Sequence, residues 1–385
     1  MTRPGLAYVV NSLNPGGTER LVVEMGLAFR DEYDLRVYCL DEPGAWAARL
    51  REAGVPVVGL WRQPGIDLAM PVVLARHLRA AGTALVHAHQ CSPWFYAALA
   101  RVLYPQPRLL LEEHGRFWPE VDAPWRRRVN RLLINRLTHR FVAVSRDVAE
   151  RLVRYEGIPA RRIEVVYNGV PRAEAPTPSH RHALRASLGI QADEYLVGTV
   201  GRLDPIKNLP MLIAAFTEVM ASNPKVRGII VGDGPRRGEM ERRVQDAGLS
   251  GRVVLTGHRD DARRLVACLD VFVLASYSEG TSMALLEAMS AAVAPVVTAV
   301  GGNPELIEDG RCGWVVPSDD ASAMARAITA ALADPARRTL RGQAAQRRFA
   351  RRFTLADMLE RYRSLYRDML GEAAAPRAAD EVRTA

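Results

Sequence analysis

The stretch YLVGTVGRLDPIKN, residues 195–208, runs from a short apolar segment of β type into a polar loop that opens a helix. Similar β-type runs recur along the whole chain and are separated by longer helical patterns. This alternation is typical of βαβ units, in which helices cover a parallel sheet. The runs are LAYVVN, LRVYCL, ALVHAH, RLLLEEH, RFVAVS and IEVVYNG before residue 171, and YLVGTVGRL, VRGIIVGDG, RVVLTGH, VFVLASYSEG, APVVTAVGG and GWVVP after residue 182.

A Pro-rich stretch, PRAEAPTPSHRH, separates the two series of runs and is typical of an interdomain linker. The sequence therefore predicts an α/β protein with two doubly wound parallel-sheet domains, residues 1–172 and 185–353, joined by a linker at 173–184. Ligands of such folds bind at the carboxyl ends of the strands, so we expect a site in the cleft between the domains. Residues 371–385 have the composition of a disordered tail.

The composition is that of a globular protein with a basic balance: 48% of residues are hydrophobic, 25% are charged, and the net charge is +9. This charge suits phosphorylated ligands, an acidic membrane surface or nucleic acid, and does not choose among them. The first apolar run is too short for a signal peptide, and no run reaches the length of a membrane span. The four cysteines lack CxxC spacing, so we expect a cytoplasmic protein with reduced thiols.

The stretch EGTSMALLE places Glu279 in a loop and Glu287 in the second turn of a helix that Ser282 is suited to cap. The helical rise separates the two carboxylates by about 10 Å, which is too far for a retaining-glycosidase pair. This separation is compatible with an inverting pair, or with two glutamates that bind opposite ends of one long ligand. An ordinary helix with acidic residues near its start is the commoner explanation of this pattern.

Two cations, Arg202 and Lys207, lie on the loop after the strand at 195–200, where they are well placed to neutralise a diphosphate. A solvated loop is an equally good interpretation of this pair alone. The chain has no D-x-D sequence, the usual carboxylate anchor for a metal-bound nucleoside diphosphate. We therefore expect no metal and no cofactor, with cationic side chains and helix ends stabilising any departing diphosphate.

Glycines follow the ends of two predicted strands. Gly16 and Gly17, in NPGGTER, would let the backbone approach an anion, although a glycine pair at this place is commonly just a turn. The stretch VGDGPRRG, with Gly232, has the wrong spacing for a dinucleotide fingerprint, so we interpret it as a loop near a nucleotide.

Three histidines end strands of the first domain. His87 and His89 share one face, but a metal needs further ligands and the sequence suggests none nearby. His114 should face the cleft. A hydrogen-bonded structural histidine is the alternative for all three, and we favour a functional role only for His114.

The order and spacing of these segments resemble those of retaining glycosyltransferases of family 4. The resemblance rests on GGTER, VSRDVAERL, VVYNGV, VGRLDPIKN, VGDGP, VVLTGH and the E-x7-E element in SEGTSMALLEAM, and it covers nearly all of the chain. It implies a GT-B fold of two Rossmann-like domains, with a nucleotide-sugar donor held by the second domain and the acceptor by the first. It also implies that a helix at 354–370 crosses back to the first domain.

The resemblance further implies a role for each matched residue. Arg202 and Lys207 would bind the diphosphate, Glu287 the ribose hydroxyls and Glu279 the donor sugar. Other groups would surround the donor. The backbone N–H groups of Met283 and Ala284 would face the phosphates, and Gly17, beside Gly16, would close over the phosphates from the first domain. His114 would contact the transferred sugar or its acceptor, and Gly232 and His258 would lie near the base.

The chain departs from the family pattern in two places. After the first glutamate it has Gly280, Thr281 and Ser282, where the family often has glycine and an aromatic residue. The usual glycine beyond the second glutamate appears as Ala292. The first departure bears on the choice of donor sugar, and the second on local packing.

The expected activity is metal-independent, retaining transfer of a sugar to a saccharide or lipid-linked acceptor in polysaccharide or glycoconjugate assembly. Such enzymes have no obvious protein nucleophile, and the leaving phosphate helps to deprotonate the acceptor on the same face. The alternatives are a UDP-sugar epimerase, a phosphorylase, or an inactive binding module with the same fold. A binding module would be expected to lack some of Arg202, Lys207, Glu279 and Glu287, and we expect no nucleic-acid partner.

The segment PWRRRVNRLLINRLTHR, residues 124–140, combines apolar residues at helical spacing with a dense basic surface. One interpretation is a helix packed on the first domain with a solvated basic face. The other is peripheral docking on an anionic membrane, at its cytoplasmic face, which would bring the acceptor site to a lipid-linked acceptor. The residues involved are Val129, Leu132, Leu133 and Leu137, the arginines 126, 127, 128, 131 and 136, and the tryptophans Trp118 and Trp125.

Overall fold

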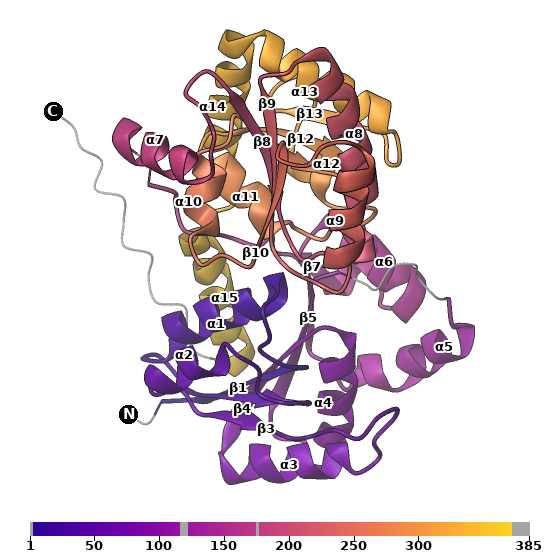
Figure 1. Ribbon diagram of the computed structural model, residues 1–385. Helices are drawn as coiled ribbons and strands as arrows, with labels where there is room; N and C mark the ends of the chain where they lie inside the picture. The colour runs from indigo at the N-terminus through magenta and orange to yellow at the C-terminus, as the bar shows by residue number, and fades with distance from the viewer. Residues whose placement is uncertain (1–2, 116–121, 175–176, 372–385) are drawn as a thin grey trace, which may run out of the picture.

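The computed structural model describes residues 3–115, 122–174 and 177–371 and contains two parallel sheets, one in each half of the chain (Figure 1). The sequence prediction of two doubly wound domains is confirmed. The first sheet has the order β3-β2-β1-β4-β5-β6-β7 and the second β10-β9-β8-β11-β12-β13. The strands are β1 (Gly5–Val10), β2 (Asp34–Cys39), β3 (Val57–Gly59), β4 (Thr83–His89), β5 (Arg108–Glu113), β6 (Arg140–Ala143), β7 (Ile163–Val165), β8 (Tyr195–Val200), β9 (Val226–Val231), β10 (Val253–Gly257), β11 (Val271–Leu274), β12 (Ala294–Thr298) and β13 (Trp314–Val316).

Helices cover both faces of each sheet, and this explains why the strands are nearly continuous apolar runs rather than alternating ones. The helices are α1 (Gly17–Phe29), α2 (Ala47–Glu52), α3 (Met70–Ala80), α4 (Cys91–Leu103), α5 (Pro124–Leu132), α6 (Arg146–Arg151), α7 (Pro178–Ser187), α8 (Leu209–Ser222), α9 (Arg237–Asp246), α10 (Ala262–Ala267), α11 (Met283–Ser290), α12 (Asn303–Leu306), α13 (Ala321–Ala333), α14 (Pro335–Arg352) and α15 (Leu355–Leu370). None of these described helices has the length and apolar character needed to cross a bilayer.

Each sheet reverses its winding direction once. In the first sheet β1 pairs with both β2 and β4, and in the second β8 pairs with both β9 and β11. Such switch points open a crevice at the carboxyl ends of the strands, because the following helices leave on opposite faces. The loops after β1, β8 and β11 are the segments in which the sequence predicts binding residues.

The chain passes between the domains at two adjacent places. Val170 donates its N–H to Phe353 O (3.2 Å) and accepts from Leu355 N (2.9 Å). Helix α15, which follows this crossing, then packs Met358, Tyr362, Leu365, Tyr366 and Met369 into the core of the first domain. The last helix therefore belongs to the N-terminal unit in packing, although it ends the described chain.

Four details differ from or lie beyond the sequence prediction. Strand β3 was not predicted, because it has only three residues. Helix α7 occupies part of the expected linker, since Thr177 caps a helix that begins with Pro178. The predicted helix at 124–140 ends at Leu132 and continues as a short 3₁₀ turn at Ile134–Arg136. Trp118 and the expected tail beyond residue 371 lie outside the described residues.

Candidate active site

The loop after β11 and the start of α11 form the centre of the site. Ser282 is the N-cap of α11, and its Oγ accepts from Leu285 N (3.4 Å), as the sequence predicts. Glu279 lies in the loop ahead of the helix and Glu287 lies within it. The first N–H groups of a helix have no intrahelical acceptor, so Met283 and Ala284 present donors and a positive dipole end here.

Glu279 contacts the loop after β8 directly. Its Oε1 lies 2.7 Å from Lys207 Nζ and accepts a hydrogen bond from Ser276 Oγ (2.5 Å). Arg202, on the same loop, is 62% exposed and pairs with Asp204 (3.0 Å). Lys207 is thus paired with Glu279, whereas the side chain of Arg202 is largely exposed.

Glu287 is almost completely buried and lies between two arginines. Arg20 Nη1, from α1 of the first domain, lies 2.8 Å from its Oε1, and Arg263 Nε, from α10, lies at the same distance from that oxygen. Arg263 also approaches Glu24 of α1 (3.8 Å). Neither arginine is predicted from the sequence to have a role, although Arg20 lies in the GGTER motif.

The starts of α1 and α11 face each other across the crevice. A Cβ built on Gly17, the first residue of α1, would lie 3.8 Å from Met283 Cγ, the first residue of α11. Glu19 folds its carboxylate back over Gly16, because a Cβ there would lie 2.2 Å from Glu19 Oε2. Burial raises the pKa of Glu19, and the charge of nearby Arg202 opposes that rise. Two helix N-termini and a cation therefore converge on one region, which favours an anion.

The positions expected near a base adjoin the same loop. Gly232 has φ of 136° and lies against Gly201, so that a Cβ there would be 2.0 Å from Gly201 O. Its N–H bonds to Gly257 O (2.9 Å), which brings the following residue, the exposed His258, to this edge of the sheet. Only glycine fits the left-handed, crowded position at 232.

His114 differs from its expected orientation. The sequence predicts that it faces the cleft, yet its side chain is only 4% exposed and its Nε2 lies 3.1 Å from His89 Nδ1. Its main-chain carbonyl, by contrast, adjoins the loop after β11, because a Cβ on Gly280 would lie 2.2 Å from His114 O. Thr281 also bonds across the domains through Oγ1 to Val144 O.

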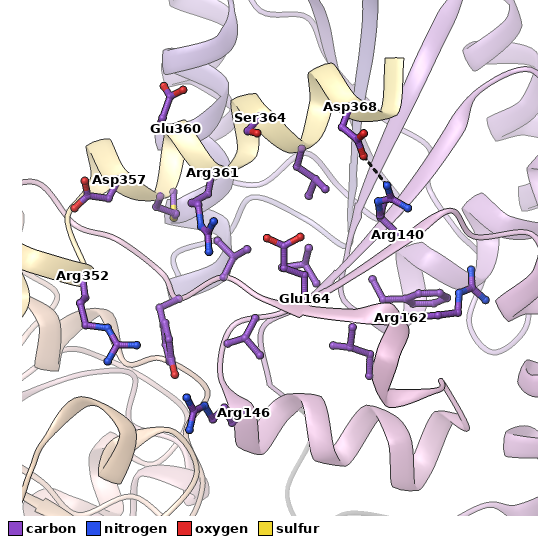
Figure 2. A pocket seen from close by; sticks show the side chains of 18 of the residues that line it. Arg140, Arg146, Arg162, Glu164, Arg352, Asp357, Glu360, Arg361, Ser364 and Asp368 are labelled. Atoms are coloured by element: carbon purple, nitrogen blue, oxygen red, sulfur yellow. Dashed lines mark hydrogen bonds and ion pairs between the residues drawn. The ribbon is translucent and has the colours of Figure 1, made fainter. Parts of the chain in front are cut away.

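A cavity of about 1350 Å³ lies elsewhere, between β6, β7 and α15, and is lined by arginines that include Arg140, Arg146, Arg162, Arg352 and Arg361 (Figure 2). None of the predicted site residues lines it. This cavity is therefore separate from the region where the starts of α1 and α11 face each other.

The chain matches two described protein families. Residues 15–174 match the family described as Glycosyltransferase Family 4, and residues 180–348 match Glycosyl transferases group 1. The putative glycosyltransferase EpsF of Bacillus subtilis (strain 168) is 24% identical over 304 residues, 76% of this chain and 78% of EpsF. The D-inositol 3-phosphate glycosyltransferase of Mycobacterium bovis (strain BCG / Pasteur 1173P2) is 29% identical over 305 residues, which are 76% of this chain but only 58% of that relative.

Solved structures show the same architecture. Anabaena HepE in complex with UDP-glucose has a TM-score of 0.85 at 24% identity, over 94% of this chain and 99% of that one. WaaG, described as a glycosyltransferase involved in lipopolysaccharide biosynthesis, has a TM-score of 0.73 at 17% identity, over 94% and 99%. At these identities the likeness shows the fold. The chain therefore belongs to the family-4 glycosyltransferases and has their two-domain GT-B fold.

Proposed function

We propose that this enzyme moves a sugar, with retention of anomeric configuration, from a nucleoside-diphosphate sugar to a saccharide or lipid-linked acceptor. The observation that carries the proposal is the facing pair of helix N-termini at Gly17 and Met283. Lys207 pairs with Glu279 in the loop before α11, and Arg202 acts electrostatically on Glu19 in the first turn of α1. Preorganised N–H groups and cations stabilise the charge that develops on a departing diphosphate.

The two glutamates divide the donor between them in this proposal. Glu279 and Lys207, 2.7 Å apart, would meet the sugar and the diphosphate, since Glu279 lies in the loop that leads into α11. Glu287 would accept from the ribose hydroxyls through Oε2, because both arginine contacts that hold it are made at Oε1. His258 and Gly232 would adjoin the base.

The anomeric configuration is retained if the acceptor attacks the sugar on the face from which the diphosphate departs, with the departing diphosphate taking the proton of the acceptor hydroxyl. The side chain of His114 is directed into a buried cluster, so we propose that its main chain, rather than its imidazole, contributes to the acceptor side. The diphosphate charge would be carried by Arg202, Lys207 and the helix N-termini, and no metal is proposed at the diphosphate.

The proposal is tested by incubating the enzyme with a panel of UDP- and GDP-sugars and measuring release of nucleoside diphosphate. UDP-sugars are the first choice, because the HepE structures were solved with UDP and UDP-glucose. We expect slow hydrolysis of one donor and acceleration by an acceptor, with the product keeping the donor's anomeric configuration. Acceptor-independent interconversion of two UDP-sugars would instead identify an epimerase, and consumption of inorganic phosphate a phosphorylase. Binding without turnover would identify a binding module.

We also propose that α5 docks on an anionic membrane. The apolar residues Val129, Leu132 and Leu133 are exposed rather than packed on the first domain, and Trp125 is 68% exposed beside them. Arg128 and Arg131 are exposed on the same helix, whereas Arg126 and Arg127 pair with Glu156 and Asp122. Apolar anchors with exposed arginines suit a headgroup region, to which each arginine contributes about 1 kcal/mol.

Cosedimentation with phosphatidylcholine vesicles of increasing phosphatidylglycerol content tests this docking. We expect binding that rises with anionic lipid and is lost when Arg128 and Arg131 are both changed to Glu. Changing Arg337 to Glu and Leu340 to Ser on the exposed face of α14 is the matched control. If binding does not depend on lipid charge, or if the α5 variant still binds, α5 is a solvated helix and not a membrane-docking element.

A further inference from the structure

A buried cluster of three imidazoles and one carboxylate lies beneath the first switch point. His87 and His89 alternate on β4, so they share a face, and His89 is the register partner of Glu112 on β5. Glu112 and His114, also two residues apart, complete the group. The side chains of His87, His89 and Glu112 are fully buried. The sequence suggested no third ligand beside the two histidines, because Glu112 reaches them only through strand pairing.

The four side chains converge on Glu112 Oε2. His87 Nε2 lies 3.0 Å from this oxygen, His89 Nδ1 lies 3.2 Å from it, and His114 Nε2 lies 3.6 Å from it. His89 Nδ1 is also 3.1 Å from His114 Nε2. In a tetrahedral site with metal bonds of about 2.0–2.1 Å, ligand atoms are separated by about 3.3 Å. The separations match those of a first coordination sphere.

Glu112 is a buried carboxylate without a cationic side-chain partner. The imidazoles of His87 and His89 and the hydroxyl of Tyr362 approach it, but neither Glu112 oxygen has a well-aligned hydrogen bond among the described residues. No Arg or Lys of the described residues forms an ion pair with Glu112. A buried carboxylate that neutral groups alone surround is costly unless a cation compensates its charge.

The hydrogen bonds around His87 favour the tautomer that binds a metal. His87 Nδ1 lies 2.7 Å from the hydroxyl oxygen of Tyr366, and where Tyr366 donates its hydroxyl to Tyr8 (3.4 Å), His87 Nδ1 is the donor of this bond. In that tautomer His87 Nε2 carries a lone pair that is directed at Glu112 Oε2, 3.0 Å away. Both atoms are then hydrogen-bond acceptors, so they repel each other unless a cation lies between them. A partner on the second ring nitrogen is usual for a metal-bound histidine.

We infer that His87, His89 and Glu112, with His114 as the fourth ligand, form a binding site for a divalent transition-metal cation, and that zinc is the ion it takes. Neutral imidazoles and a carboxylate are ligands that zinc accepts. Because all four ligand side chains are buried, the ion is structural. It ties the β4 and β5 ends to α15 through Tyr366, and it fixes the backbone of His114 against Gly280. This site is separate from the diphosphate and does not depend on the proposed transfer reaction.

The test uses the full chain with any affinity tag removed, dialysed against metal-free buffer, and measures bound metal by inductively coupled plasma mass spectrometry. We expect about one equivalent of zinc per chain, or of cobalt after growth on cobalt, in a tetrahedral site. His87→Gln and Glu112→Gln should each retain less than about a tenth of it. His180→Gln, on the exposed surface of α7, is the matched control and should keep the metal.

A second measurement covers variants that fail to fold. X-ray absorption of the wild-type zinc protein should show nitrogen and oxygen neighbours with imidazole scattering and no sulfur, which separates this site from the four cysteines. Metal-free wild type that takes up neither zinc nor cobalt, with an unfolding temperature unmoved by zinc or chelator, would overturn the inference. Sulfur neighbours, or metal retained by well-folded His87→Gln and Glu112→Gln proteins, would overturn it too.

Discussion

Arg20 of the first domain and Glu287 of the second form an ion pair across the crevice, with Nη1 and Oε1 separated by 2.8 Å. Arg263 contacts the same oxygen from the second domain. The carboxylate proposed to bind the ribose therefore contacts one arginine from each domain. The contact also links the proposed donor site to the relative position of the domains, since α1 carries both Arg20 and Gly17, which faces α11.

Replacing Glu287 with Ala should mainly weaken nucleotide binding. A ribose contact is made equally in the ground and transition states, so the loss should appear in the dissociation constant of the nucleoside diphosphate and leave turnover largely unchanged. We expect affinity to fall by roughly 10- to 150-fold, the range for a charged hydrogen-bond acceptor. Isothermal titration measures this, with Glu241→Ala on the exposed face of α9 as the control. A large fall in turnover at saturating donor would contradict the assignment.

Replacing Glu279 with Ala should lower turnover more than nucleotide affinity, because its proposed partner is the transferred sugar rather than the nucleotide. The change also frees Lys207 Nζ, which lies 2.7 Å from Glu279 Oε1, to bind the diphosphate alone. Nucleoside diphosphate should then bind about as tightly as to wild type. If the Glu279 and Glu287 variants bind it equally weakly, the two carboxylates do not divide the donor as proposed.

Replacing Lys207 with Ala should remove roughly 2–4 kcal/mol of transition-state stabilisation, or about 30- to 900-fold in turnover, comparable to the loss of one preorganised donor. The chain contains just one other lysine, Lys225, which is exposed and pairs with Asp193. Lys225→Ala is thus a closely matched control and should keep wild-type kinetics. Near-wild-type turnover in Lys207→Ala would remove this residue from the mechanism.

Transfer should not depend on added magnesium or manganese, since cations and helix N-termini are available for the diphosphate charge and the chain lacks D-x-D. Initial rates should be equal with and without either ion, and after EDTA is added to the assay. The zinc inferred at Glu112 is buried, so brief exposure to EDTA addresses the diphosphate alone. Activity that is abolished by EDTA and restored by magnesium or manganese would refute metal-independent transfer.

His139 should make stability depend on pH. Its Nδ1 accepts a hydrogen bond from Leu109 N (3.0 Å), and burial, aided by nearby arginines, lowers its pKa to about 4. The imidazole of an unfolded chain has a pKa near 6.5. Between about pH 6.5 and pH 4, His139 is therefore protonated in the unfolded chain but largely neutral in the folded one. The contribution to stability is complete above about pH 6.5 and is lost progressively down to about pH 4.

The measurement is urea unfolding between pH 7 and pH 4. His139→Asn keeps an acceptor near the Nδ1 position but does not titrate, so its stability should fall less over this range than that of wild type. His180→Asn, at an exposed position, should follow the wild-type curve. Identical pH dependence in His139→Asn and wild type would show that this histidine is not the source.

Local patterns predicted much of the fold and part of the site. Both sheets follow from apolar runs of strand length, and the capped helix at Ser282 follows from a polar residue before an apolar segment. These features depend on neighbours in the chain, so they can be recognised without the fold. The short β3 and the helix within the expected linker were missed, because three apolar residues or one Thr-Pro pair give too weak a pattern.

The sequence by itself determined the two-domain α/β architecture, the capped helix between the glutamates and the positions of the cations after β8. Only the tertiary structure decided that Arg20 contacts Glu287 and that Glu112 contacts His87 and His89. It also decided that the imidazole of His114 is buried against His89. The physical reason is that hydrophobic periodicity records which face of an element is buried, whereas strand order and register decide which side chains meet there. Contacts between residues far apart in the chain leave no periodic trace in a single sequence.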